Sequence, residues 1–258
     1  MELFVFKIVI TPLLLLTASL AARRWGESIG GLIVGLPLTS GPISFFFALE
    51  YGTEFATQAT LGSLSATAAQ ACFAVVFYFL VAYGCCKALI IATVTFSVTA
   101  YILQVSQLSQ SMLFIIDILI MMIAMIFIPN VSVNLKKLSP PRWDLPARML
   151  LIAVLVVGVT LVAPFIGAGA SGVLASYPFM ASILAVFSYI MINAQAAQRV
   201  MRGLVAGLFS FAVFFYTLSL VLPKFNLIVA YTAAIICALI VQFISLRYIQ
   251  RTPKKVIH

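Results

Sequence analysis

Prolines, glycines and hydroxyl side chains interrupt the long apolar runs of this sequence, and they are its best candidates for chemistry. The stretch GLPLTSGP, residues 35–42, holds two prolines and two glycines beside a Thr and a Ser. A proline removes one amide donor and crowds the carbonyl four residues earlier, whereas glycine permits non-helical torsions. In hydrocarbon, carbonyls that lose their donors need protein or a wet cavity beside them. The pattern predicts an interrupted helix that binds a solute; the alternative is a kinked helix whose prolines and glycines only improve packing.

A second stretch, SYPFMAS at 176–182, corresponds to the first under an offset of 141 residues, which places Pro37 on Pro178. Interrupted segments at corresponding positions of two halves are the best pointer in a sequence to a transporter's binding site. Each proline lies about eight residues into its predicted span, so both reach near mid-depth at about 1.5 Å per residue. The predicted substrate-binding residues are Pro37, Thr39, Ser40, Gly41, Ser44, Tyr177, Pro178 and Ser182.

Asp117, in the stretch FIIDILIMM, is the only acid well inside an apolar run. A carboxyl group inside a membrane is costly and is by default a functional candidate. It could carry a proton and couple transport to the proton gradient. The alternative is a structural Asp that is hydrogen-bonded to a neighbouring helix. Its position outside the two repeats described below weakens the coupling role.

Polar side chains also follow one another in the predicted third span. Thr60 and Thr67 are seven residues apart and share a helical face, as do Ser63 and Gln70. These four residues are candidates for the wall of a central cavity. The alternative is a face of small residues that lets helices pack closely, with hydroxyl groups bridging between them.

Catalysis and metal binding find little support in the sequence. GASG at 169–172 resembles the GxSG signature of rhomboid proteases, but a serine nucleophile needs a histidine base. The only histidine is His258, on the predicted opposite side of the membrane from Ser171. The four cysteines do not have the spacing of metal ligands, and the sequence has no P-loop motif. We therefore expect no catalytic residue, no metal site and no cofactor.

The elements that hold these residues must be membrane helices. Of the 258 residues, 64% are hydrophobic and 8% are charged, and the mean hydropathy is +1.20. Apolar stretches of roughly 20 residues recur from end to end, as in polytopic helical membrane proteins. No polar segment is long enough for a separate soluble domain. We predict a single all-α membrane domain over residues 1–258, in contact with the lipid bilayer.

Nine apolar spans can be drawn, and the charges between them predict an orientation. Thirteen of the 15 Lys and Arg residues fall on one side, and only Lys7 and Lys224 fall on the other. An excess of Lys and Arg marks the cytoplasmic side, so the N-terminus is predicted outside and the C-terminus inside. The net charge of +9 then reflects orientation in the cell (inner, plasma) membrane rather than binding to nucleic acid. The spans are 3–22, 29–49, 55–83, 88–104, 109–129, 148–166, 170–190, 196–222 and 225–246.

The offset of 141 residues extends beyond the two prolines. It places Gly31 on Gly172 and Gly62 on Gly203, without gaps across most of each half. The first span runs inward and the sixth outward, which predicts two inverted four-helix repeats. An alternative is two five-helix halves, one of which has lost a tenth span. The predicted units are repeat one (3–104), a connector helix (109–129), a cytoplasmic loop (130–147), repeat two (148–246) and a basic tail (247–258).

Inverted repeats with interrupted helices favour a secondary transporter that moves a small solute by alternating access. The layout resembles that of families built from two inverted five-helix halves, such as bile-acid-symporter-like carriers and LrgB-type proteins. That likeness is architectural and carries no residue over. The alternative is a non-catalytic membrane subunit or a small pore without coupled transport. Besides lipid and the solute, a second copy of the chain is left open as a partner.

Overall fold

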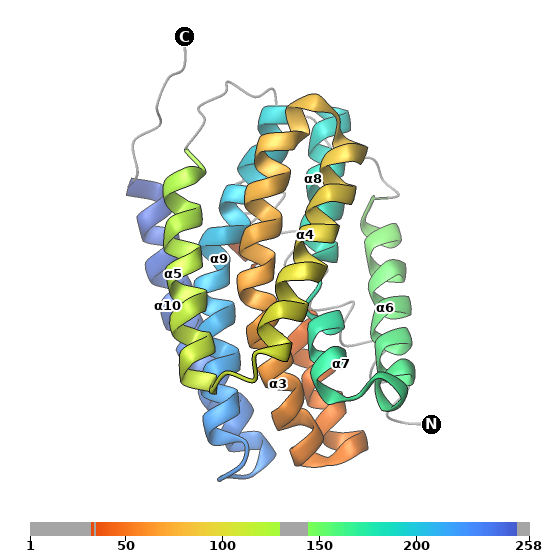
Figure 1. Cartoon of the computed structure of the whole chain (residues 1–258), viewed down its shortest axis with the longest axis vertical. Helices are drawn as coiled ribbons and strands as arrows, with labels where there is room; N and C mark the ends of the chain where they lie inside the picture. Colours follow the sequence, from red (N-terminus) through yellow and green to blue (C-terminus); the bar gives the residue numbers. More distant parts are fainter. Residues whose placement is uncertain (1–31, 34, 130–143, 252–258) are drawn as a thin grey trace.

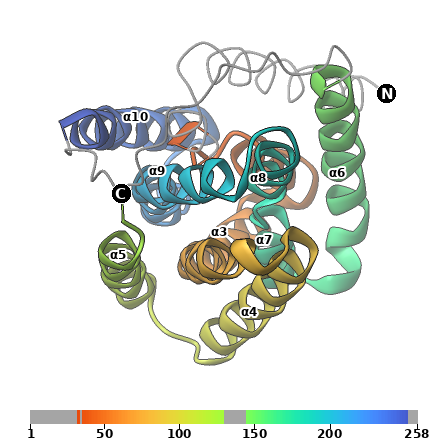
Figure 2. The same ribbon diagram turned by 90° about the horizontal axis from the view of Figure 1, so that it is seen from above.

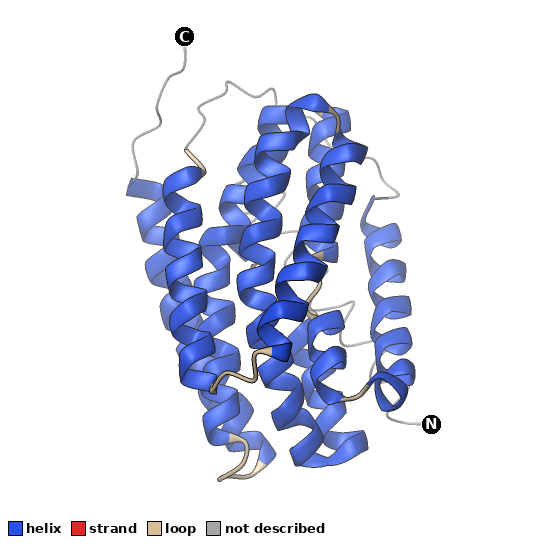
Figure 3. Cartoon of the chain, viewed as in Figure 1, coloured by secondary structure: helices blue, strands red, loops and turns tan. Residues whose placement is uncertain are grey.

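The computed structural model describes residues 32–33, 35–129 and 144–251 (Figure 1). The predicted first span, most of the predicted cytoplasmic loop and the end of the basic tail lie outside these ranges. All regular structure in the described part is helical (Figure 3). Six of its helical stretches are long and apolar enough to cross a membrane, as expected of a multi-pass membrane protein. The count of nine spans, the orientation and the repeat stay predictions.

The described helices follow the predicted spans. The segment Ser40–Leu80 holds the later part of the predicted second span and most of the third as two helical parts, separated at Gly52, whose torsions (φ 89°, ψ 166°) are not helical. The predicted seventh span is broken into two helices by residues 176–178. In chain order the elements are α3 (Ser40–Leu80), the 3₁₀ turn η1 (Val81–Tyr83), α4 (Cys85–Val105), α5 (Gln110–Phe127), α6 (Asp144–Ile166), α7 (Ala168–Ala175), α8 (Phe179–Met191), α9 (Ala194–Val221) and α10 (Leu227–Arg251).

Short polar residues set the starts of several helices. The side chain of Asn193 accepts a hydrogen bond from the first turn of α9, and Asn226 does the same for α10. Ser109 accepts from the first turn of α5. Such caps satisfy amides that have no partner inside a helix. Gly84 separates η1 from α4. Its φ of 129° is open to glycine but is rarely adopted by residues that carry a side chain.

α3 and α9 form the centre of the molecule. They pack directly against one another, and both pack against α5. α4 lies against α3 and α10 lies against α9, on the outside of this pair (Figures 1 and 2). The outer helices carry large apolar side chains, such as Ile90, Ile126 and Ile228, that are 65% exposed or more. Soluble proteins rarely expose apolar surface on this scale, so these faces are suited to lipid.

Backbones approach one another most closely at glycines. A methyl group at Gly35 would lie 2.6 Å from the Cα atom of Gly207 on α9. Gly172 of α7 meets the carbonyl of Ala59 on α3 in the same way. The missing side chains let these segments cross at short range, as in other membrane bundles. Both proline-containing stretches are thereby held against the central pair, one on α9 and the other on α3.

Candidate functional site

The stretch 35–39, called the first break below, is not helical, and α3 begins directly after it at Ser40. Pro37 lies in the middle of this turn, which confirms the expectation that GLPLTSGP does not stay helical throughout. Three backbone hydrogen bonds close the turn. They run, from N–H to carbonyl, from Leu36 to Ile33 (3.1 Å), from Leu38 to Leu36 (2.7 Å) and from Gly41 to Pro37 (2.9 Å).

The first break deprives the carbonyl of Leu32 of its helical donor, because the N–H of Leu36 bonds to Ile33 instead. Gln242 of α10 supplies the missing donor, with its Nε2 atom 3.0 Å from that carbonyl oxygen. The Oε1 atom of the same amide accepts a hydrogen bond of 2.7 Å from Ser210 of α9. The buried amide of Gln242 therefore satisfies the carbonyl of Leu32 and connects the first break to α9 and α10.

The same backbone pattern recurs in residues 176–178, called the second break below, between α7 and α8. Adding 141 to the donor and acceptor numbers of the first break gives the hydrogen bonds of the second. They run from Tyr177 to Leu174 (3.2 Å), from Phe179 to Tyr177 (2.8 Å) and from Ser182 to Pro178 (2.9 Å). The two proline turns thus share one backbone hydrogen-bonding pattern at corresponding positions.

Both breaks leave amides at the start of a helix without an acceptor. Within the described residues, Thr39 and Ser40 donate no backbone hydrogen bond, and neither do their counterparts Met180 and Ala181. Neither helix start has a side-chain cap. First-turn amides carry the positive end of the helix dipole and normally bond to a cap or to water. Because Ser40, Met180 and Ala181 are buried, these amides are available to a ligand rather than to bulk water.

Tyr177 fills the space at the second break. Its hydroxyl group lies 2.6 Å from the Oγ1 atom of Thr93 on α4, and either oxygen can be the donor. Its ring packs edge to face on Phe73 of α3 and Phe96 of α4, with centroid separations of 6.1 and 5.2 Å. Pro178 is buried beside it. The second break is therefore anchored on α3 and α4.

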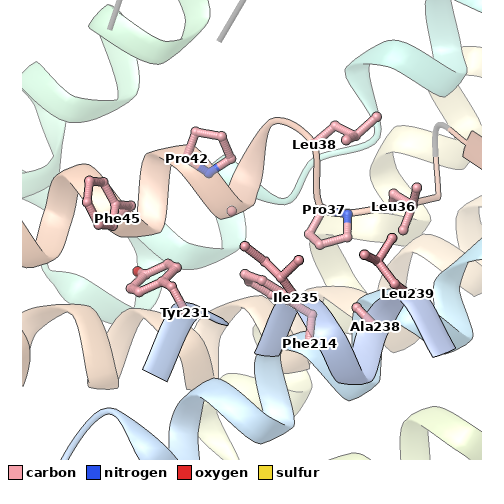
Figure 4. Close-up of a pocket in the computed structure, with 11 residues that line it drawn as sticks. Leu36, Pro37, Leu38, Pro42, Phe45, Phe214, Tyr231, Ile235, Ala238 and Leu239 are labelled. Atoms are coloured by element: carbon pink, nitrogen blue, oxygen red, sulfur yellow. The ribbon is translucent and has the colours of Figure 1, made fainter. Parts of the chain in front are cut away.

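A pocket of about 410 Å³ lies at the first break, where Leu36 takes the position that corresponds to Tyr177 (Figure 4). The predicted residues Pro37 and Gly41 line one side of the pocket, and α9 and α10 form the other side. Its lining is apolar apart from the phenol group of Tyr231.

The remaining residues of the predicted binding set lie at or near the starts of α3 and α8. Ser44 is buried, and its hydroxyl lies 2.7 Å from that of Tyr231 on α10. Ser182 donates to the carbonyl of Pro178 (2.8 Å), which steadies the start of α8. Thr39 directly precedes α3 but does not cap it. Ser44 therefore joins the first turns of α3 to α10, whereas Ser182 lies in the first turn of α8.

The predicted cavity wall on α3 faces α7 and the second break. Ser63 donates to the carbonyl of Gly172 on α7 at 3.3 Å. Thr67 donates to the carbonyl of Ser63 (2.9 Å), and Thr60 bonds within its own helix. Gln70 is 4% exposed, and its Nε2 atom has no hydrogen-bond partner in the described structure. The wall thus combines hydroxyl groups that are hydrogen-bonded with one amide nitrogen that has no partner.

Asp117 of α5 is fully buried against another face of α3. Its Oδ1 atom accepts a hydrogen bond of 3.0 Å from the backbone N–H of Ala68. Its Oδ2 atom has no partner among the described residues. Ala68 does not share the helical face of Ser63, Thr67 and Gln70, so the carboxyl group contacts α3 away from the second break. This contact is the one expected of a structural Asp, and the role in proton coupling stays a prediction.

Three residues that the sequence analysis did not single out complete these surroundings: Gln242, Tyr231 and Thr93. The sequence could have indicated Gln242, because it is the only amide well inside the apolar run of the last predicted span. The sequence did not indicate Tyr231 and Thr93, since a single hydroxyl group in a membrane helix is common. Their roles come from contacts between distant segments, 187 residues apart for Tyr231 and Ser44.

No protein-family model, no curated protein and no solved structure matches this chain. A proposal about its function therefore depends on the geometry of the two breaks and on the helices packed around them.

Proposed function

We propose that the protein is a secondary transporter that moves a small solute by alternating access, with its site at the two helix breaks. The observation that carries this proposal is the recurrence, at an offset of 141 residues, of the three hydrogen bonds that close each break. Transporters with inverted repeats bind their substrate at such corresponding interruptions, near mid-depth in the membrane.

Each break packs against the outer and central helix of the other half. The first break contacts α9 through Gly207 and α10 through Gln242. The second break contacts α3 through Phe73 and α4 through Thr93. At the offset of 141, α9 corresponds to the part of α3 after Gly52, and α10 corresponds to α4. This reciprocal packing, in which each break contacts two helices of the other half, supports a pseudo-two-fold axis. It also links a movement of either half to both breaks.

The helix α5 has the position expected of a connector. It packs against both α3 and α9, the two central helices that correspond to one another. A helix that belongs to neither repeat and contacts both central helices alike lies near the axis that relates them. This placement supports the division into two four-helix repeats and one connector.

The second break presents N–H groups without an acceptor, which suit an anion, and carbonyl oxygens without a backbone donor, which suit a cation. The amides of Met180 and Ala181 lack acceptors, and the carbonyls of Ala175 and Ser176 receive no backbone N–H. In transporters with discontinuous helices, such N-termini face anionic groups of the substrate, whereas freed carbonyls coordinate a coupling cation. A broken helix with both features supports coupled transport more than a role in packing alone.

Cysteine accessibility tests the proposal without knowledge of the solute. The hydroxyl groups of Ser40 and Ser176 are buried and have no partner, so a cysteine at either position should be tolerated. In a variant without the four native cysteines, we expect S40C and S176C to react with a membrane-impermeant maleimide from both sides of sealed vesicles. S65C is the matched control, because Ser65 is equally buried on α3 but bonds to the carbonyl of Leu61; it should stay unmodified.

The alternatives give different outcomes in the same vesicles. A pore predicts labelling from both sides together with a steady ion conductance. A non-transporting subunit predicts that neither cysteine reacts from either side and that the protein copurifies with a fixed partner. Absence of labelling at both S40C and S176C would overturn the site at the two breaks.

A further inference from the structure

We propose that the second break binds the carboxylate group of a small organic monoanion. This inference names the substrate class of the proposed transporter and rests on that function. The start of α8 holds the carboxylate oxygens together with the side chains of Ser176 and Gln70, and each of these groups is buried.

The first component of the site is the N-terminus of α8, a helix of 13 residues. The amides of Met180 and Ala181 point along the axis without an acceptor, and no side chain caps the helix. Met180 is 7% exposed and Ala181 is 0% exposed, so bulk water does not replace the missing acceptors. A helix start of this kind attracts an anion through its free N–H groups and its dipole.

The second component is independent of the helix start. The Oγ atom of Ser176 and the Nε2 atom of Gln70 are buried side-chain atoms without a hydrogen-bond partner. Ser176 is 3% exposed and Gln70 is 4% exposed. A buried donor that is left unsatisfied costs free energy, and native structures contain few of them. Two such donors beside an uncapped helix start indicate a ligand with several acceptor positions.

Contacts on either side of Gln70 place it at the level of the break. On one side, Ser63 donates to the carbonyl of Gly172 in α7. On the other side, the ring of Phe73 packs against that of Tyr177. Gln70 lies between these contacts on the helical face that it shares with Ser63. Its amide therefore faces the segment that runs from Gly172 to Tyr177 and contains Ser176.

The charge of this group of donors matches a monoanion. A helix start supplies roughly half an elementary charge, and Ser176 and Gln70 add neutral donors. No lysine or arginine belongs to the set, so the second charge of a dianion such as phosphate would be left without compensation in a buried site. The carbonyls of Ala175 and Ser176 repel the anion from the end of α7 and favour the start of α8.

The first break also has a buried hydroxyl without a partner, that of Ser40, but it lacks counterparts of Gln70 and Ser176. At the offset of 141, Gln70 corresponds to Phe211 and Ser176 corresponds to Gly35. Neither counterpart can donate a side-chain hydrogen bond, and the pocket at the first break is apolar. Both breaks have an uncapped helix start and a buried hydroxyl without a partner, but only the second adds the buried amide of Gln70, and this difference assigns the carboxylate to the second break.

Thermal unfolding of the purified full chain with simple probes tests the inference. We expect sodium butyrate to raise the Tm, whereas butyramide, sodium chloride and sodium phosphate at equal ionic strength should not. In Q70L, loss of one donor to a charged group should weaken butyrate binding about tenfold or more. The Tm without butyrate should not fall in Q70L, since the substitution removes an unsatisfied donor. The control Q58L changes an exposed glutamine on the same helix and should bind butyrate as the wild type does.

The outcomes distinguish a failure of the carboxylate site from a failure of the proposed transport function. A Tm that does not respond to butyrate, or that responds equally to chloride, would overturn the carboxylate site, and so would full retention of the butyrate response in Q70L. If S40C and S176C nevertheless become accessible from both sides, the transporter stands and only its substrate class is wrong. Butyrate binding lost in Q70L without accessibility at either cysteine would support the site and contradict the transporter.

Discussion

A single hydrogen bond distinguishes the two roles considered for Asp117. Its Oδ1 atom accepts from the N–H of Ala68, and an asparagine at this position keeps an oxygen that can do the same. D117N should therefore fold with an unchanged Tm but lose the ability to exchange a proton. We expect butyrate uptake into proteoliposomes to lose its pH dependence in D117N. A pH profile equal to that of the wild type would leave Asp117 with its structural role alone.

Gln242 is expected to matter for stability rather than for specificity. Replacement by leucine leaves the buried carbonyl of Leu32 without this donor, whereas the hydroxyl of Ser210 keeps its hydrogen bond to the carbonyl of Gly207. We expect Q242L to lower the free energy of unfolding by about 1–3 kcal/mol, the usual penalty for buried polar groups left unsatisfied. Denaturant titration in mixed micelles measures the change, with Q58L as the exposed control. Equal stability of Q242L and the wild type would show that the broken helix does not need this amide.

Among the elements, the two breaks depend on their prolines. Alanine at Pro37 or Pro178 restores an amide and removes the clash that keeps the turn from becoming helical. We expect P37A and P178A to insert normally and to lose most butyrate uptake in proteoliposomes. P164A is the control, because Pro164 is an exposed proline inside α6, away from both breaks. Uptake that survives in both P37A and P178A would show that the breaks are not needed for transport.

Helix crossings depend on glycine in a different way. A Cβ atom at Gly35 would meet the backbone of Gly207, which no rotamer change can relieve. We expect G35A to lower the free energy of unfolding by about 1–3 kcal/mol, as for other overpacked sites. Gly158 in α6 has open space around its Cα atom, so G158A should be neutral or slightly stabilising. Matched unfolding curves measure the difference, and equal effects of the two substitutions would contradict a tight crossing.

At the scale of the whole molecule, the connections lie at two opposite ends. Figure 1 draws the turn before α4 and the C-terminal end of α10 at one end, and the α4–α5 and α9–α10 connections at the other. The orientation predicted from the charges puts the first of these ends in the cytoplasm. In single-cysteine variants, we expect exposed Cys86 to react with an impermeant maleimide only in inside-out vesicles, and K224C only in right-side-out vesicles. The reverse pattern would invert the predicted orientation.

Local physics accounts for what the sequence could predict. Apolar length indicates membrane helices, and the fixed torsion of proline predicts that residues 35–42 interrupt one. The separation at Gly52 agrees with the boundary predicted between the second and third spans, which falls at residues 50–54. The partner of the carbonyl of Leu32 could not be predicted, since Gln242 lies 210 residues away in the chain. The unpartnered amide of Gln70 likewise emerges only when the neighbouring helices are in place.

The shared proline turn also bears on how such a chain could have evolved. A proline fixes its torsion whatever surrounds it, so the turn can persist while neighbouring side chains drift. Under the proposed inverted repeat, selection after duplication of an ancestral gene needed to keep the two prolines and their small neighbours, while Tyr177 in one half and Leu36 in the other could differ. Distant descendants should then be easier to find by a pair of prolines about 141 positions apart than by overall similarity.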